Sequence, residues 1–189
     1  MTRKILLLVF ALALWPGKAP AEDVRRTRLD RGDVLLEKHS LPDSDIPEVT
    51  VTAVIDSPPE RVWPIIDHCG NYMHTMLHIA ISKELTRVGP IVRCESTVSL
   101  AWPLPDLHAI TRAVHTPGPD KWVRAWKMET GDYKVNEGSW TLTVWAPGKT
   151  LAEYRMHSEP NVSIPGFVQD IVANSVMPDL MNKLRAETK

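Results

Sequence analysis

The C-terminal part of the chain repeats apolar residues at helical spacing. Between residues 168 and 184, apolar side chains recur every three or four positions, and polar side chains fall largely between them. Pro165 suits the first position of a helix, because its missing N–H would have no partner there in any case. Pro178 removes one backbone hydrogen bond and predicts a bend. The pattern predicts a long, bent amphipathic helix whose apolar stripe lies against another apolar surface.

From Ile79 onward the residues alternate between apolar and polar, which is typical of half-buried β-strands. Turn signals such as Gly89-Pro90 and Glu137-Gly138 separate the alternating segments. Their close spacing favours antiparallel neighbours, because parallel strands need long crossover connections. Residues 34–36 and 49–55 are interpreted as earlier strands, joined by a Pro- and Asp-containing turn at residues 41–48. The later strands are predicted at residues 79–88, 91–100, 107–116, 122–129, 140–145 and 151–158.

A helix is predicted directly after these earlier strands. Asp56 or Ser57 can cap it, prolines follow, and Glu60 lies three residues after Ser57, as in a capping box. A second short helix, with the sequence YMHTML, is predicted shortly after the first. A twisted antiparallel sheet curls, and its concave face needs a cover. The C-terminal helix is the only predicted element that is long and apolar enough to provide that cover.

The first residues have the layout of a secretory signal peptide. Arg3 and Lys4 precede an apolar run that ends at Trp15, and a small-residue tripeptide ends at Ala21. The apolar run is roughly half of the ~20 residues that a membrane-spanning helix needs. We therefore expect residues 1–21 to be removed near Ala21, so that the mature chain is exported to the periplasm or secreted.

Composition adds limits on the partners. The 189 residues, of which 43% are hydrophobic and 24% charged, suit one globular domain. Residues 22–32, where Arg and Asp alternate, are predicted to be a flexible lead-in to a domain at residues 33–187. Loss of residues 1–21 removes three positive charges and takes the formal net charge from −1 to about −4. No basic tail or stripe remains, which argues against nucleic acid as the main partner.

The two cysteines allow two interpretations. In an oxidising compartment, Cys69 and Cys94 can pair as a disulfide. Cys94 also alternates with apolar positions in a predicted strand, and buried free cysteine is common. Both interpretations stay open on the sequence alone.

Four stretches in order resemble the START-related lipid-transfer and polyketide-cyclase-like (SRPBCC) superfamily. They are VTAVIDSPPERVWPIIDHCGNY, AWPLPDLHAITRAV, EGSWTLTVWAPGKTLAEYRM and SIPGFVQDIVANSVMPDLMNKLR. The resemblance spans roughly residues 33–187, although His108 stands near where the family often has an Arg-Asp pair. It implies an α+β helix-grip fold: a curved antiparallel sheet of about seven strands, two short helices after the first strand, and a long C-terminal helix over an apolar cavity.

Such a cavity would hold a lipid, a sterol, a quinone or an aromatic polyketide. The Met and aromatic residues at alternating strand positions suit an adaptable pocket, but the same residues can interdigitate as a dry core. Arg124 is either a partner for an anionic or carbonyl head group or a solvated arginine. The predicted ligand-binding residues are Met76, Val98, Leu100, Arg124, Trp126, Met128, Trp140, Leu142, Tyr154, Met156, Phe167, Ile171, Val172 and Ser175.

Motifs for catalysis are absent from the sequence, which lacks GxSxG, GxxxxGK[ST], GxGxxG and CxxC. His74 and His78 are four residues apart, as in some metal sites, but the sequence indicates no third ligand. Asp67-His68 is interpreted as a helix C-terminus in preference to an oriented general base. We expect no catalytic residue, no metal and no cofactor.

Three hypotheses follow. The first is an exported, monomeric carrier that binds a hydrophobic small molecule or lipid and contacts membranes transiently, without enzymatic activity. The second is a cyclase- or aromatase-type enzyme that folds a polyketide-like substrate in the same cavity, with Arg124, Tyr154 or a histidine guiding proton transfer. The third is an assembly factor of the cell envelope whose cavity is filled by its own side chains, with Trp126, Trp140 and Met156 packed without a void.

Overall fold

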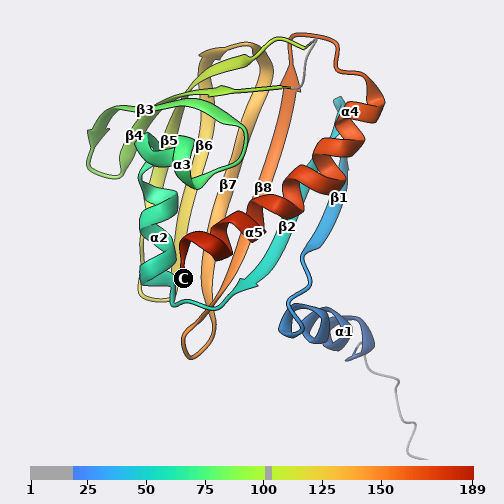
Figure 1. Ribbon diagram of the computed structural model, residues 1–189, viewed down its shortest axis with the longest axis vertical. Coiled ribbons are helices and arrows are strands. Elements are labelled where there is room, and N and C mark those ends of the chain that lie inside the picture. The colour runs from blue at the N-terminus through green and yellow to red at the C-terminus, as the bar shows by residue number, and fades with distance from the viewer. Residues whose placement is uncertain (1–18, 101–103) are drawn as a thin grey trace, which may run out of the picture.

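The computed structural model describes residues 19–100 and 104–189, which form an α+β domain built on one sheet (Figure 1). The strands are β1 (Leu35–Leu41), β2 (Ser44–Ile55), β3 (Ile79–Val88), β4 (Ile91–Val98), β5 (Leu107–Thr116), β6 (Lys121–Gly131), β7 (Tyr133–Ala146) and β8 (Lys149–Pro160). The helical elements are α1 (Ala19–Asp30), α2 (Pro59–Asp67), the 3₁₀ turn η1 (Cys69–Asn71), α3 (Tyr72–Thr75), α4 (Gly166–Ile171), the π-helical turn η2 (Val172–Val176) and α5 (Met177–Glu187).

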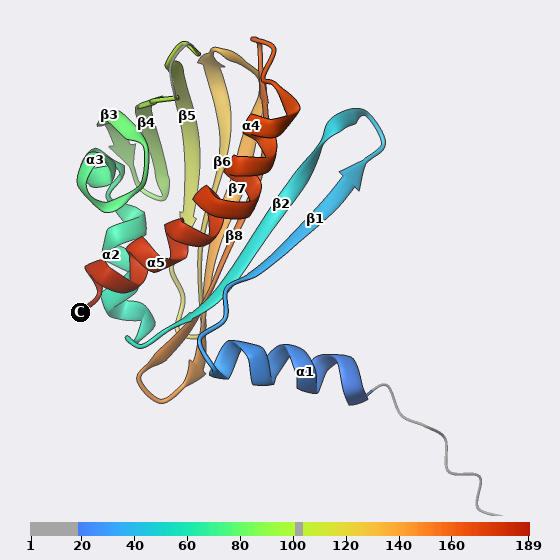
Figure 2. The ribbon, with the colours of Figure 1, turned by 45° about the vertical axis from the view of Figure 1, so that its right-hand side comes forward.

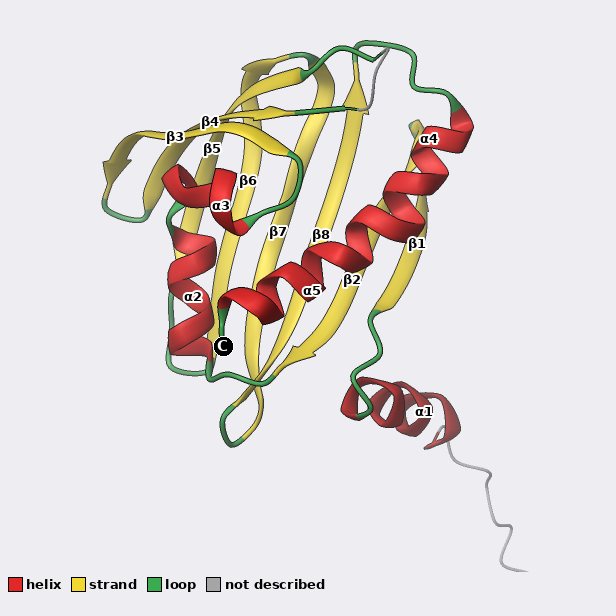
Figure 3. Cartoon of the chain, viewed as in Figure 1, coloured by secondary structure: helices red, strands yellow, loops and turns green. Residues whose placement is uncertain are grey.

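The sheet is antiparallel throughout, with the strand order β1-β2-β8-β7-β6-β5-β4-β3. Strands β3 to β8 follow one another as neighbours, and β2 then pairs with β8, so the first hairpin lies beside the last strand. Figures 1 and 3 show helices α2, α3, α4 and α5 on one face of the twisted sheet, whereas α1 lies apart from them beside the start of β1. These features confirm the predicted helix-grip fold, with eight strands in place of about seven.

The C-terminal helix crosses the sheet diagonally as one rod made of α4, η2 and α5 (Figures 1 and 2). The predicted effect of Pro178 takes the form of a π-helical turn, in which the Met177 N–H donates to the Val172 carbonyl five residues earlier. A proline ring clashes with the carbonyl four residues before it, and the wider turn gives that ring room. The rod therefore stays continuous over the sheet.

The solid part of the core lies where α2 and α5 meet the sheet. Val62 and Ile66 of α2 and Leu184 of α5 are fully buried there, in one cluster with the inward-facing residues of β2, β7 and β8. Burial of a side chain of this size contributes about 1.5–3 kcal/mol to folding. This packing fixes one end of the C-terminal helix, and the other end, α4, extends beyond it.

The N-terminal lead-in differs from the prediction. Residues 22–32, expected to be flexible, lie mostly in helix α1. Leu29 is 2% exposed and packs in a small cluster with Leu35 and Val54, while Trp145 donates a hydrogen bond from Nε1 to Asp30 (2.7 Å). Leu29 and the contact with Trp145 hold the segment in place. The alternating charges of the sequence do not indicate either contact. The predicted signal peptide falls mainly on residues 1–18, which lie outside the described residues, and it stays a prediction.

Strand β7 begins earlier than predicted, at Tyr133 in place of Trp140. Glu137-Gly138 had indicated a break, but Gly138 lies inside the strand and pairs with Met156 of β8. A Cβ atom at Gly138 would lie 2.6 Å from the Trp126 ring and 2.2 Å from the Arg155 carbonyl. This glycine therefore marks a close approach of side chain to backbone and not a turn.

Among the described residues, no helix combines the length and the apolar character needed to cross a membrane.

Candidate functional site

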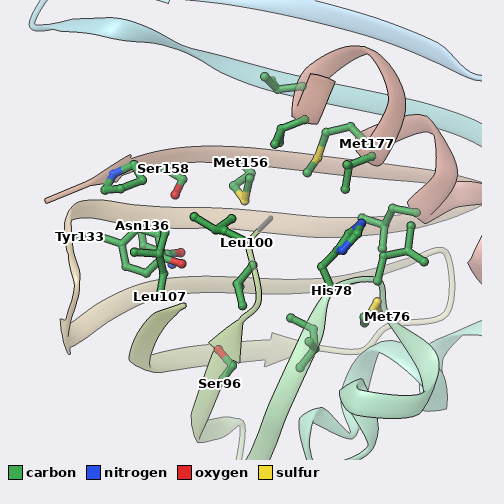
Figure 4. A pocket seen from close by; sticks show the side chains of 18 of the residues that line it. Met76, His78, Ser96, Leu100, Leu107, Tyr133, Asn136, Met156, Ser158 and Met177 are labelled. Atoms are coloured by element: carbon green, nitrogen blue, oxygen red, sulfur yellow. The ribbon is translucent and has the colours of Figure 1, made fainter. Parts of the chain in front are cut away.

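A cavity of about 770 Å³ lies between the concave face of the sheet and the C-terminal helix. Apolar side chains from β4 to β8, from the segment after α3 and from α4 to α5 make up most of its wall (Figure 4). The volume is within the range of about 300–1,000 Å³ typical of sites for small molecules. The alternative of a core filled by the protein's own side chains does not hold, because Trp126, Trp140 and Met156 line open space.

Aromatic rings form one wall of the cavity. Trp126 of β6 stacks on Tyr154 of β8, with ring centroids 5.6 Å apart and an interplanar angle of 23°, and Trp140 of β7 lies 4.6 Å from the same tyrosine. Trp126 reaches across β7 because Gly138 leaves its path free. Its Nε1 donates to Asn136 Oδ1 (3.1 Å), which fixes the orientation of the indole. The three rings present a broad, rigid apolar surface.

A buried arginine stands at one end of this surface. Arg124 of β6 is 4% exposed and lines the cavity, which contradicts the interpretation of it as a solvated side chain. Its Cζ lies 5.4 Å from the Trp126 ring and 5.5 Å from the Tyr72 ring, so the cation has an aromatic face on two sides. Its one hydrogen-bond contact to the described residues is from Nη2 to Cys94 Sγ at 3.6 Å. Such cation–π contacts stabilise a desolvated guanidinium by about 2 kcal/mol or more each.

The two cysteines form a disulfide, which resolves the alternatives that the sequence left open. Cys69 follows α2 and Cys94 lies on β4, with Cα atoms 6.3 Å apart and a sequence separation of 25. Both residues line the cavity close to Arg124. The bond ties the short helical segment to the sheet at the arginine end of the cavity.

Most of the predicted ligand-binding residues line the cavity, and their contact with a ligand stays a prediction. The structure corrects the predicted set at three positions, because Met128, Leu142 and Ser175 do not line the cavity. Met128 packs in a separate cluster near one end of the sheet, Leu142 is fully buried in the solid core, and Ser175 is exposed on the π-helical turn. Alternation along a strand identifies the inward face but not which part of that face stays uncovered.

Sequence reasoning missed several residues of the wall. Ile46 and Pro47 were assigned to a turn but belong to β2, and Tyr133 and Asn136 belong to the early part of β7. Counting back from Trp140 in steps of two through Gly138 reaches Asn136, so the period-two signal was present. Tyr133 does not follow this count, because the β7–β8 register shifts between Tyr133 and Val135.

His74 and His78, which are four residues apart in sequence, lie in different surroundings. His78 lines the cavity and His74 is exposed on α3. In the described part of the chain, no group of three His, Cys, Asp or Glu side chains is arranged to hold a metal ion. His68 caps the end of α2, where its N–H donates to the Pro64 carbonyl, as its interpretation as a helix C-terminus implies.

Asp67 contacts a different histidine from the one adjacent in sequence. His115 of β5 is buried beside Arg124 in the strand register, and its Nδ1 lies 2.5 Å from Asp67 Oδ1, which also accepts from Arg87 (3.0 Å). Burial lowers the pKa of His115 below its usual value, and the nearby charge of Arg124 lowers it further, although Asp67 opposes both. A neutral ring that donates from Nδ1 leaves Nε2 as an acceptor, and Nε2 has no partner among the described residues. Burial also acts to raise the pKa of Asp67, but hydrogen bonds from Arg87 and His115 bring it below the usual value.

This histidine predicts a pH dependence of stability. The folded-state pKa of His115 lies below the ordinary 6.5, so the unfolded chain binds the proton more readily. The stabilisation by neutral His115 is complete above the unfolded-state pKa of 6.5. It is lost as the pH falls from there through the lower folded-state pKa. We expect the free energy of unfolding of the wild type, measured with urea, to decrease as the pH is lowered from about 8 to about 5. The decrease should be smaller in His115→Gln. The exposed His39→Gln variant is the control, and equal slopes in the wild type and His115→Gln would contradict the assignment.

Known structures share this architecture. The STAR-related lipid transfer protein of Xanthomonas axonopodis (fragment 25–204) superposes with a TM-score of 0.69 at 17% identity, covering 82% of this chain and 93% of that one. Human StAR-related lipid transfer protein 5 gives a TM-score of 0.73 at 12% identity, covering 89% and 92% of the two chains. The chain has the START fold. The Zhui aromatase/cyclase of Streptomyces sp. R1128 shares the START fold as well, with a TM-score of 0.61 at 14% identity over 82% and 94% of the chains.

No protein-family model matches the chain, and no curated protein matches it in sequence. The START fold is therefore established by structure, at identities too low to transfer a ligand or an activity.

Proposed function

We propose that this chain is an exported carrier that holds one hydrophobic small molecule, such as a lipid, a sterol or a quinone-like compound, in the cavity under its C-terminal helix. The observation that carries the proposal is the open apolar cavity of about 770 Å³. The lipid transfer proteins that share the START fold support it. The signal-peptide pattern and the Cys69–Cys94 disulfide support export, because disulfides persist in oxidising compartments.

The free energies of burial and of hydrogen bonding favour an apolar guest. Each buried methylene contributes about 0.8 kcal/mol, so a chain of about ten methylenes supplies roughly 8 kcal/mol before the costs of association. A single neutral hydrogen bond contributes about 1 kcal/mol net. Burial of apolar surface therefore dominates affinity, and polar side chains set orientation.

The helix end near the cavity supports transient contact with a membrane. Phe167 and Ile171 of α4 line the cavity and are 68% and 54% exposed. Large apolar side chains in this position would enter the lipid surface and bring the cavity opening to the guest. The carrier would act as a monomer, because the cavity is complete within one chain.

Solvent extraction tests the proposed function. The mature protein, purified from the exported fraction without detergent, is extracted with chloroform and methanol and analysed by mass spectrometry. We expect a co-purified hydrophobic compound at close to one per protein, and saturable binding of a fluorescent fatty acid or sterol by the extracted protein. Recovery of no such compound together with no probe binding would contradict the proposal.

A variant that fills the cavity should block binding. Ser96 on β4 lines the cavity, so Ser96→Trp places an indole in the space of the guest. We expect probe affinity to fall at least a hundredfold, because roughly four buried methylenes of contact are displaced. Thr97→Trp is the matched control, since the next residue of a strand points to the opposite face and Thr97 does not line the cavity. Equal loss in both variants, with folding intact by circular dichroism, would argue against this site.

The Zhui neighbour supports a second candidate, a cyclase- or aromatase-type enzyme. Arg124 and Tyr154 line the cavity and would stabilise an enolate or guide a proton. Burial raises the pKa of Tyr154 above its usual value, so its hydroxyl stays a donor at neutral pH. Turnover of a polyketide mimic by the wild type and its loss in Tyr154→Phe would favour this activity over the carrier.

A further inference from the structure

Arg124 is a buried cation without a counter-ion. It is 4% exposed, its Nε is buried with no partner among the described residues, and the one polar contact given by Nη2 is to a disulfide sulfur at 3.6 Å. A buried charge without a partner destabilises the fold, because protein and aromatic rings replace its hydration only in part. The side chain nevertheless lines the cavity, where a guest can reach it.

Every carboxylate of the described residues near the cavity already has another partner. Asp67 accepts from Arg87 and His115, at 3.0 and 2.5 Å. Glu95 pairs with His108 at 3.1 Å. Asp170 of α4 is largely exposed and lies 3.8 Å from Lys38. None of the ion pairs of the described residues includes Arg124, so no side chain there neutralises it.

The cavity combines this cation with a long apolar path. In the strand register Arg124 lies beside Trp140, and Trp140 lies beside Tyr154. Trp126, Val172 and the exposed Phe167 line the same cavity. A guest that fills this path has its polar end at the buried cation and its apolar end near α4. One end of the site is selective for charge and the remainder is selective for apolar surface.

We propose that the guest is an amphiphile with a single carboxylate, such as a long-chain fatty acid, which enters with the carboxylate first and pairs with Arg124. This inference rests on the proposed function and names the class of ligand that the same cavity takes. A guanidinium binds a carboxylate with charge-assisted hydrogen bonds, which are about twice as strong as neutral ones. A neutral alcohol or sterol would leave Arg124 without a compensating charge.

The surroundings of Arg124 favour a carboxylate over a phosphate group. A phosphate monoester carries about −1.5 to −2 charges at neutral pH, and one arginine neutralises only part of that charge. Arg87, the other cation of this region, is already bound to Asp67 and Glu84. A zwitterionic head group would bring an ammonium to a place where the described carboxylates are all engaged. A monoanion matches Arg124, the cation at this end of the cavity that has no carboxylate partner among the described residues.

Competition against a fluorescent probe tests the inference with matched ligands on the full mature protein. Hexadecanoic acid, hexadecanol, methyl hexadecanoate and hexadecyl phosphate share one chain length and differ in the polar end. We expect the acid to bind roughly ten- to hundredfold more tightly than the alcohol and the ester, as for a hydrogen bond to a charged group, and more tightly than the phosphate. A phosphate that binds as well as the acid would overturn the assignment to a carboxylate.

Two variants complete the test. Arg124→Met keeps an unbranched, flexible side chain and removes the charge, so the preference for the acid should disappear while hexadecanol binds at least as tightly as before. Arg124→Lys keeps the charge and should retain part of the preference. Equal affinity of acid and alcohol in the wild type, or a preference that persists in Arg124→Met, would overturn the inference alone. Failure of every ligand to bind would overturn the proposed function as well.

Discussion

Replacement of Gly138 by alanine is expected to lower the free energy of unfolding by roughly 2–3 kcal/mol and to weaken ligand binding. The added Cβ would meet the Arg155 carbonyl at 2.2 Å and the Trp126 ring at 2.6 Å, so either β7 moves away from β8 or the indole leaves its place. Trp126 forms the aromatic wall with Tyr154, and a displaced ring narrows or opens the cavity. Urea denaturation measures the first effect and probe titration measures the second.

Gly166→Ala is the matched control. Gly166 has nothing within 4 Å of an added Cβ, so the same substitution at the start of α4 should change stability by less than about 0.5 kcal/mol. If Gly138→Ala were as stable as this control, the close approach of Trp126 to β7 would be contradicted.

Removal of the disulfide has the second large effect. The double variant Cys69→Ser, Cys94→Ser frees a segment of 25 residues in the unfolded chain and should lower the free energy of unfolding by roughly 3 kcal/mol. For a domain of this size the midpoint of thermal unfolding would fall by about 6–12 °C. Differential scanning calorimetry of the wild type with and without dithiothreitol should reproduce the same difference.

The reductant itself provides the control. Dithiothreitol should leave the melting temperature of the double variant unchanged, because no bond remains to be reduced. The wild type can also be unfolded, treated with reductant and refolded before the melting temperature is measured. An unchanged melting temperature after this treatment would show that Cys69 and Cys94 are not joined.

The sequence predicted the positions of strands and helices better than it predicted how their side chains pack. Period-two alternation and the Gly-Pro turns located strands such as β3 and β5 within their observed bounds, and the apolar stripe located the C-terminal helix. The break inferred at Gly138 shows the limit of this approach. A glycine inside a strand can mark a turn or a close contact, and only the position of Trp126 distinguishes the two.

The prediction of the candidate site rested more on the resemblance to START-related proteins than on the pattern of apolar residues. Trp140 and Leu142 occupy equivalent positions two residues apart on β7, yet one lines the cavity and the other is solid core. The difference is set by where α2 packs on the sheet, which is a property of the tertiary structure. The burial of Arg124 was also beyond the sequence, since an arginine in an alternating strand is usually exposed. Tyr72 and the disulfide enclose it from segments far away in the chain.

A crystal structure of the protein grown with ω-bromohexadecanoic acid tests the central claim most directly, because the anomalous scattering of bromine marks the apolar end of the ligand. We predict one strong peak inside the cavity, between the sheet and the C-terminal helix, on the side of Phe167 and Ile171. A bromine bound only at the outer surface, or a cavity closed by movement of α4 and α5 onto the sheet, would contradict the account.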